Sequence, residues 1–246
     1  MSETQILTRY LYDKAKVQQK LEYTVINQDI QESLFWVYEL YFTGFIEDVI
    51  HIAYALYDKY YKIRYPKLKS FLLKKTRELR EQIAADPAIP IDNTLIGTIF
   101  HNMITRIPVL DKGEPMDEWK GRNIYMNLSQ DKIVPYMTAT PQTLGIPAYK
   151  FLRVVCKYSC MTPDHACTQS PFDITLPIPL RDHWEYLANN TPYWRSVFET
   201  WGVVDFHPKT RCIIFDTEEH EEEFYKVYGY EMDEQPAKVL QYCLGV

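Results

Sequence analysis

The sequence predicts a mainly α-helical protein, with an N-terminal multi-helix bundle or stack and a smaller α+β or irregular C-terminal part. Two observations carry this prediction. Between residues 29 and 105, apolar side chains recur at helical spacing in four segments with short links. Later, prolines interrupt the chain, and two β-branched and aromatic runs flank a turn. We expect a helical domain over 1–107, a connecting segment over 108–146 and a mixed domain over 147–246.

Start and stop residues delimit the helices of the first half. Asp29, followed three residues later by Glu32, is typical of a capped helix start, and Gly44 is typical of a helix end. Pro66 suits the first turn of a further helix. Apolar residues cover more than half of the first helix, so we expect that helix to be central. The four predicted helices span 29–44, 45–61, 66–84 and 92–105.

The second half is predicted to contain shorter elements of both kinds. The prolines of 171–180 exclude a helix there and favour an extended chain. The turn HPKT lies between two apolar runs and predicts a β-hairpin over 203–216. The predicted helices are a short one near 130, one from 147 to about 160, two short ones over 183–190 and 192–202, an acidic one over 216–229 and a last one over 236–244.

Composition bounds the class of protein. The chain has 246 residues, of which 46% are hydrophobic and 24% charged, as in folded proteins. Only eight glycines occur, and the familiar nucleotide-binding motifs are absent from the sequence. The N-terminus has no apolar run typical of a secretion signal, and no run is long enough to span a bilayer. Five cysteines, an odd number, favour a reducing compartment. We therefore expect an intracellular protein without membrane contact.

Charge is distributed unevenly along the chain. Residues 59–80 contain nine basic side chains and one acidic, a balance of +8 in a chain of net charge −6. Residues 216–234 contain nine acidic side chains and one basic. The basic segment predicts a phosphate-contacting face, because clustered cations release counterions from nucleic acid. A solvated helix face, or docking of the acidic segment onto the basic one, explains the same pattern. The candidate polyanion-binding residues are Lys67, Lys74, Arg77, Lys62 and Arg64.

Many aromatic residues lie close to this basic segment. Tyr57 and Tyr60 share a helix face with Ile46, Ile50 and Ala53, so we expect them to be core residues rather than a base-stacking surface.

Trp36 falls on the polar arc of its helix. We therefore expect it on the surface, as a candidate anchor for a protein partner. Burial by another layer of the fold is the alternative.

One cluster has metal-ligand residue types. Cys156, Cys160, His165 and Cys167 lie within twelve residues, and thiolates with imidazole suit tetrahedral Zn²⁺. The spacing of the two cysteines of the first pair is not that of the common zinc knuckle. Buried structural cysteines are the alternative, so zinc is a hypothesis and no other cofactor is expected.

Catalytic patterns are weak. Asp117, Glu118 and Lys120 have the residue types of a nuclease site, but no predicted strand precedes them. His220 begins HEEEF, which lacks the second histidine of a zinc protease motif. No set of residues defines a reaction, and we favour a protein that is not an enzyme.

Two segments carry longer motifs. Ser33 to Phe45 matches the pattern S-L-[FW]-W-x-Y-E-L-Y-[FY]-[ST]-G-F, and Phe224 to Gln235 matches F-Y-x-x-Y-x-Y-E-x-D-E-Q. In both motifs the chain resembles uncharacterised proteins of nucleocytoplasmic large DNA viruses. The resemblance implies a virion component or a factor that acts on the viral genome, in the host cytoplasm, virus factory or virion. It implies no catalytic residue.

Two functional hypotheses follow from the sequence. The first is a structural or protein-interaction protein, viral in origin, with a protein partner or self-association. The second is a nucleic-acid-associated factor that binds polyanions through residues 59–80. A nuclease-like enzyme is a distant third.

Overall fold

The structure is a computed structural model that describes residues 6–85, 91–110, 120–121, 123–137, 184–207, 209–210 and 212–228. Helices dominate these residues, and the predicted mainly α fold is confirmed. The chain divides into two compact units. We call them the helical unit (Gln18–Tyr41 and Phe45–Met137) and the mixed unit (Met1–Val17, Phe42–Gly44 and Thr138–Val246). The division predicted at residues 107 and 146 stays a prediction.

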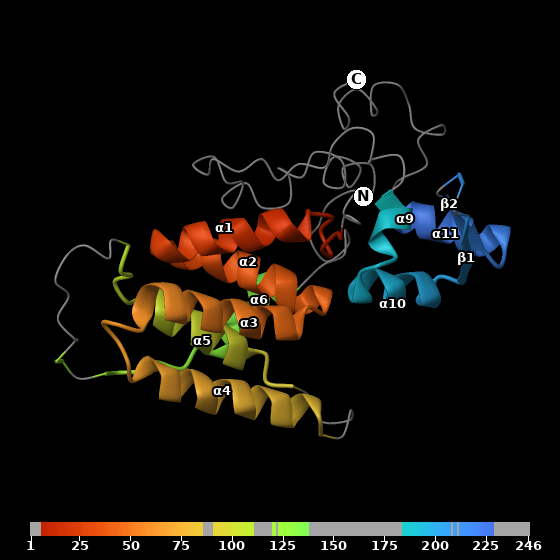
Figure 1. The fold of residues 1–246 in the computed structure, drawn as a ribbon. Coiled ribbons are helices and arrows are strands. Elements are labelled where there is room, and N and C mark those ends of the chain that lie inside the picture. Colours follow the sequence, from red (N-terminus) through yellow and green to blue (C-terminus); the bar gives the residue numbers. More distant parts are fainter. Residues whose placement is uncertain are drawn as a thin grey trace. The chain divides into compact units, whose positions relative to one another are not determined.

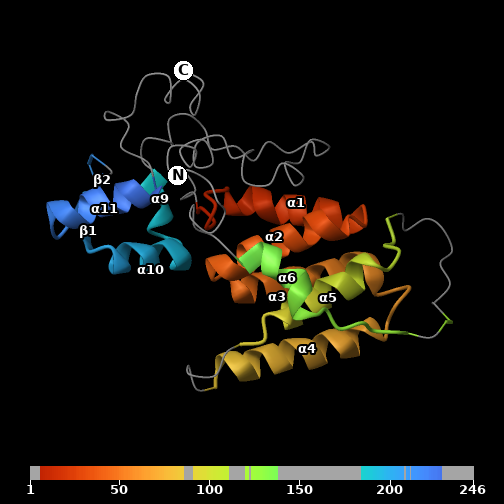
Figure 2. The same ribbon diagram turned by 180° about the vertical axis from the view of Figure 1, so that it is seen from behind.

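The helical unit contains most of α1 (Lys14–Ile26) and of α2 (Ile30–Thr43). It continues with α3 (Ile46–Leu56), the π-turn η1 (Tyr57–Tyr61), α4 (Leu68–Ile83), α5 (Thr94–Ile104) and α6 (Gln130–Met137). Figures 1 and 2 show α1, α2, α3 and α4 following one another down this unit, and α4 packs against both α3 and α5. The four helices predicted between 29 and 105 and the short one near 130 are confirmed, whereas α1 was not predicted.

Local signals explain the helix ends. The Asp29 carboxylate accepts a hydrogen bond from the Glu32 amide at 2.9 Å, as an N-cap does. Gly44 has φ of +98°, the left-handed conformation that ends α2 at little cost for glycine. Ahead of α5, the Asp92 carboxylate accepts from the Thr94 amide at 2.9 Å. These caps confirm the predicted start of α2 and place the start of α5.

The core of the helical unit surrounds α2. Residues 33–41 of this helix are all buried, which confirms the expectation of a central helix. In α5, Gly97 lets two neighbours approach closely, because a Cβ there would overlap the Tyr38 hydroxyl of α2 and the Leu128 side chain. Tyr57 is buried as expected, and Tyr60 is half-buried with its hydroxyl 2.5 Å from the Glu22 carboxylate.

The mixed unit combines helices with a small sheet. Its elements are α9 (Trp184–Ala188), α10 (Pro192–Thr200), β1 (Val203–His207), β2 (Cys212–Phe215) and α11 (Glu218–Tyr228). The strands pair antiparallel with Phe206 opposite Ile213, so the predicted hairpin is confirmed. Aromatic rings fill its core: Trp184 lies 4.8 Å from Trp194, and Phe215 lies 5.4 Å from Phe224. The predicted elements over 147–180 and 236–244 lie outside the described residues.

Candidate functional site

A groove of about 490 Å³ runs along α4 in the helical unit. One wall is a face of α4, and the other is the extended segment that precedes α6. None of the lining residues is acidic. They are Lys67, Ser70, Phe71, Lys74, Lys75, Asn123, Tyr125 and Asn127, and we call this surface the basic groove.

Helical spacing places the α4 side chains on one face. Lys67, Phe71 and Lys74 are three or four residues apart, about one turn, so they lie above one another along the helix. Leu68 and Leu72 point the other way and are fully buried. The apolar stripe therefore anchors α4 in the core and leaves its lysines on the groove.

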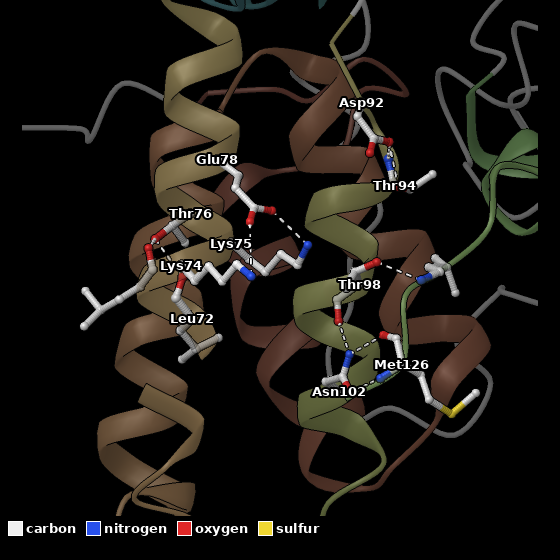
Figure 3. Close-up of polar contacts among 12 residues, drawn as sticks. Leu72, Lys74, Lys75, Thr76, Glu78, Asp92, Thr94, Thr98, Asn102 and Met126 are labelled. Carbon is white, nitrogen blue, oxygen red and sulfur yellow. Dashed lines mark hydrogen bonds and ion pairs between the residues drawn. The ribbon is translucent and has the colours of Figure 1, made fainter. Parts of the chain in front are cut away.

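The opposite wall, residues 123–128, is held by two side chains of α5 and by Arg106, two residues after its end. Asn102 brackets Met126: its Nδ2 donates to the Met126 carbonyl at 2.6 Å, and its Oδ1 accepts from the Met126 amide at 3.0 Å. Thr98 accepts from the Leu128 amide at 2.8 Å, and Arg106 donates to the Ile124 carbonyl at 2.9 Å. Figure 3 shows the bonds of Thr98 and Asn102. Three side chains one helical turn apart thus satisfy alternate backbone groups of an extended chain.

Alternation along this segment divides its side chains between two cavities. Tyr125 lines the basic groove, and Met126 and Leu128 line a second cavity. Asn127 lines both. Successive side chains of an extended chain point to opposite faces, so one segment forms a wall of each cavity.

An aromatic column forms the centre of the basic groove. The rings of Phe71 and Tyr125 stack at 4.2 Å with an interplanar angle of 3°. The Arg106 guanidinium lies 4.8 Å from the centroid of the Tyr125 ring. Burial lowers the pKa of Arg106, yet an arginine remains charged at neutral pH. Burial also raises the pKa of Tyr125, which keeps its hydroxyl protonated. Arg106, Tyr125 and Phe71 therefore stack in that order.

The lysines of the groove differ in their partners. Glu78, one turn along α4, lies 2.8 Å from Lys75 and 4.0 Å from Lys74, as Figure 3 shows. Lys67 is exposed and has no acidic partner among the described residues. Lys75 is mostly covered, with 17% of its side chain exposed. The groove thus holds one unpaired cation and two that share a single carboxylate.

The structure separates the other predicted basic residues from this groove. Lys62 is exposed and lies 3.6 Å from Asp58, while Arg77 lies 3.6 Å from Glu81. Arg64 is half-buried, with its guanidinium 5.9 Å from the centroid of the Tyr65 ring. Of the five predicted residues, the groove brings together Lys67 and Lys74.

The acidic partners of the basic segment come from nearby helices. Glu47 of α3 accepts two hydrogen bonds from Arg80, which lower the pKa of the Glu47 carboxyl. Glu22 of α1 lies 2.6 Å from Lys59. Within the described residues, the cations of 59–80 are thus partly neutralised by their own unit.

The expected surface position of Trp36 is wrong, because its side chain is 0% exposed. The polar arc of α2 faces α1 rather than water: the Trp36 indole donates to Glu32 at 3.3 Å, and Glu32 pairs with Lys20 of α1. Ser33 and Glu39 on the same arc are also buried. Trp36 is therefore a core residue and offers no surface to a partner.

The zinc hypothesis concerns residues outside the described part of the chain. Cys156, Cys160, His165 and Cys167 all lie there, as do Asp117 and Glu118 of the weak nuclease pattern. Within the residues that the structure describes, no group of three or more His, Cys, Asp or Glu side chains could hold a metal ion.

A second cavity of about 570 Å³ lies between the start of α2, α5 and α6. Its lining is largely apolar and includes Ile30, Leu34, Met126, Pro135 and Tyr136. His101 also borders it, and burial lowers the pKa of its imidazole. We call this surface the apolar pocket.

Comparisons of the chain with protein-family models, with curated proteins and with solved structures found no match. Among the helices of the described ranges, none is both long and apolar enough to cross a membrane.

Proposed function

We propose that the protein is a nucleic-acid-associated factor whose basic groove contacts phosphate groups. One observation carries the proposal: Lys67, Lys74 and Lys75 converge on a groove that no acidic side chain lines. Clustered cations bind a polyanion mainly by releasing its condensed counterions, and this gain needs no specific sequence. The proposed phosphate contacts are therefore confined to the groove, whereas the sequence predicted them over the whole basic segment 59–80.

The ion pairs beside the groove do not oppose this role. Lys74 has 68% of its side chain exposed, and exposed ion pairs are worth about 0–1 kcal/mol. A phosphate can therefore replace Glu78 as the partner of Lys74 at small cost. Glu78 acts as a weak internal competitor for the lysines of the groove.

The proposal is tested by the binding of a fluorescent mixed-sequence oligonucleotide. Fluorescence anisotropy is measured between about 50 and 200 mM salt, the range over which phosphate contacts are lost. We expect Lys67→Glu/Lys74→Glu to weaken binding at least about tenfold, since each lost charged hydrogen bond is worth about 1.5–3 kcal/mol. Lys62→Glu is the matched control, because Lys62 is exposed on the same unit but outside the groove. Salt-insensitive binding, or equal losses in the double variant and the control, would contradict the proposal.

A gain-of-function variant sharpens the test. Glu78→Gln keeps the side-chain volume and removes the carboxylate that contacts Lys74 and Lys75. We expect tighter oligonucleotide binding and a steeper dependence on salt, because two cations become available to phosphate. Unchanged affinity would show that these lysines do not reach the ligand.

A structural or protein-interaction role is the second candidate. The apolar pocket favours it, because Met126 at its edge is 60% exposed and an apolar pocket can accept an anchoring side chain of a partner or of a second copy. Light scattering over a concentration series tests self-association, which Met126→Glu should abolish; a strict monomer at all concentrations would exclude self-association.

The resemblance of Ser33–Phe45 and Phe224–Gln235 to proteins of large DNA viruses supports placing either role in a virion or virus factory.

A further inference from the structure

We infer that the basic groove takes single-stranded nucleic acid, with one unpaired base stacked on Phe71 and the flanking phosphates on Lys67 and Lys74. This inference rests on the proposed function and names the form of nucleic acid that the groove accepts. It follows from three features of the groove: an aromatic ring in its lining, lysines before and after that ring along α4, and a support of hydrogen bonds for the ring's stacking partner.

The first feature is the Phe71 ring. One face of the ring stacks on Tyr125 at 4.2 Å. No other ring or cation contacts Phe71 among the described residues, and its side chain is half-buried and lines the groove. The ring thus borders the groove, and a planar ring bound there would extend the column Arg106–Tyr125–Phe71.

The second feature is the spacing of the cations. Lys67 precedes Phe71 by four residues and Lys74 follows it by three, so they lie about 6 Å and about 4.5 Å away along the helix axis. A base on Phe71 would therefore have a lysine on either side, within reach of the phosphates that flank its sugar. Aromatic faces between backbone-binding cations are how proteins bind single strands without sequence preference.

The third feature is rigidity. Tyr125 belongs to the segment whose backbone is held by Asn102 of α5 and by Arg106, just after the end of α5. The Arg106 guanidinium supports the far face of the Tyr125 ring. A preformed stacking surface costs little ordering on binding, which favours affinity.

Duplex nucleic acid does not match these features. Its base faces are buried in the helical stack, and the grooves present only base edges. A duplex can contact the lysines but not the Phe71 ring. The cavity of about 490 Å³ has the size of a small-ligand pocket, suited to one unstacked nucleotide.

The experiment compares three ligands on the full chain: a labelled single strand, a hairpin duplex of the same length, and unlabelled inorganic polyphosphate as competitor. The variants are Phe71→Leu, which removes the ring, and Phe71→Tyr, which keeps it. Thermal unfolding followed by circular dichroism confirms that each variant is folded at the temperature of measurement. Affinity is taken from anisotropy at each of several salt concentrations.

We expect the single strand to bind about 5- to 100-fold tighter than the duplex, the range that stacking of one base provides. Phe71→Leu should remove this preference for the single strand and leave duplex binding and the salt slope unchanged. Phe71→Tyr should retain the preference. Equal binding of duplex and single strand, or single-strand binding unaffected by Phe71→Leu, would overturn the inference and leave the proposed function standing. Failure of every polyanion to bind would instead overturn the proposed function itself.

Discussion

A buried charge pair lies at the junction of α1 and α2. Lys20 has 1% of its side chain exposed, and its Nζ lies 3.1 Å from the Glu32 carboxylate, of which 15% is exposed. The same carboxylate accepts the Trp36 indole hydrogen bond. The Lys20 ammonium also lies 5.4 Å from the centroid of the Tyr23 ring. Removing an ion from water costs free energy. The attraction between the two opposite charges offsets that cost here, because each lies beside its partner.

Breaking this pair should be far more harmful than replacing it. Glu32→Gln leaves the Lys20 ammonium buried without a counter-charge, which we expect to lower the free energy of unfolding by about 3–5 kcal/mol. Lys20→Met/Glu32→Gln removes the stranded charge at similar volume and should recover much of that loss. Urea unfolding of the wild type, both single variants and the double variant gives the coupling energy. A loss below about 1 kcal/mol for Glu32→Gln would indicate that water reaches the pair.

At the scale of elements, α5 positions the groove without lining it. Asn102 is buried and satisfies both backbone groups of Met126. Thr98 and Arg106 bond to the backbone two residues further along and two residues before, at Leu128 and Ile124. These bonds replace the strand neighbour that an extended chain would otherwise need. The position of Tyr125, and therefore of the aromatic column, depends on side chains of α5, which does not line the groove.

Asn102→Asp tests that dependence. Aspartate has the shape of asparagine but no donor, so its carboxylate would face the Met126 carbonyl and repel it. We expect faster amide hydrogen exchange at Met126 and Leu128, a stability loss of about 1–3 kcal/mol and weaker single-strand binding, although no groove residue is changed.

Thr98→Val is the matched control for that substitution, because it removes one acceptor, for the Leu128 amide, and introduces no charge. A smaller effect is expected from it. Native exchange rates at Met126 in Asn102→Asp would show that the segment is held by other contacts.

Elements with local signals could be predicted from the sequence, and elements held by distant side chains could not. The caps at Asp29 and Gly44 are encoded within a few residues, which is why α2 was predicted almost to its ends. In contrast, α1 has a capping residue, Asp13, whose carboxylate accepts from the Lys16 amide at 3.1 Å, but no strong apolar stripe, and it was not predicted. The segment around Met126 has no sequence periodicity that predicts its conformation. Its backbone is held by Asn102 of α5, and local sequence does not show that contact.

The same distinction applies to the site. Lys67 and Lys74 could be predicted from their charge and spacing, whereas the sequence does not distinguish Phe71 from the other apolar residues of α4. The position of Phe71 in the groove involves its stacking on Tyr125, more than fifty residues later in the chain. The error at Trp36 has a similar origin, since helix periodicity identifies a polar arc without showing that a buried lysine covers it.

At the scale of the whole molecule, a segment near the N-terminus packs with an element far along the sequence. The mixed unit joins its N-terminal segment to α10 across more than 180 residues: the Thr191 hydroxyl donates to the Leu7 carbonyl, and the Trp194 indole donates to the Thr8 carbonyl at 3.2 Å. Residues 7, 8 and 10–12 are buried. Residues 7–12 are therefore a structural part of the unit that contains the hairpin and α11.

Removal of residues 1–12 should consequently disrupt a part of the fold that lies far along the sequence. Trp184 and Trp194 are fully buried in the mixed unit, and Trp194 would lose its indole acceptor. We expect a red shift of tryptophan emission and faster amide exchange in α9, α10 and α11. Thr191→Val, which removes one buried hydrogen bond, should cost about 1–3 kcal/mol and leave the emission maximum unchanged. Native emission and exchange in the shortened chain would contradict the role assigned to the N-terminal segment, because they would show that α10 packs fully without it.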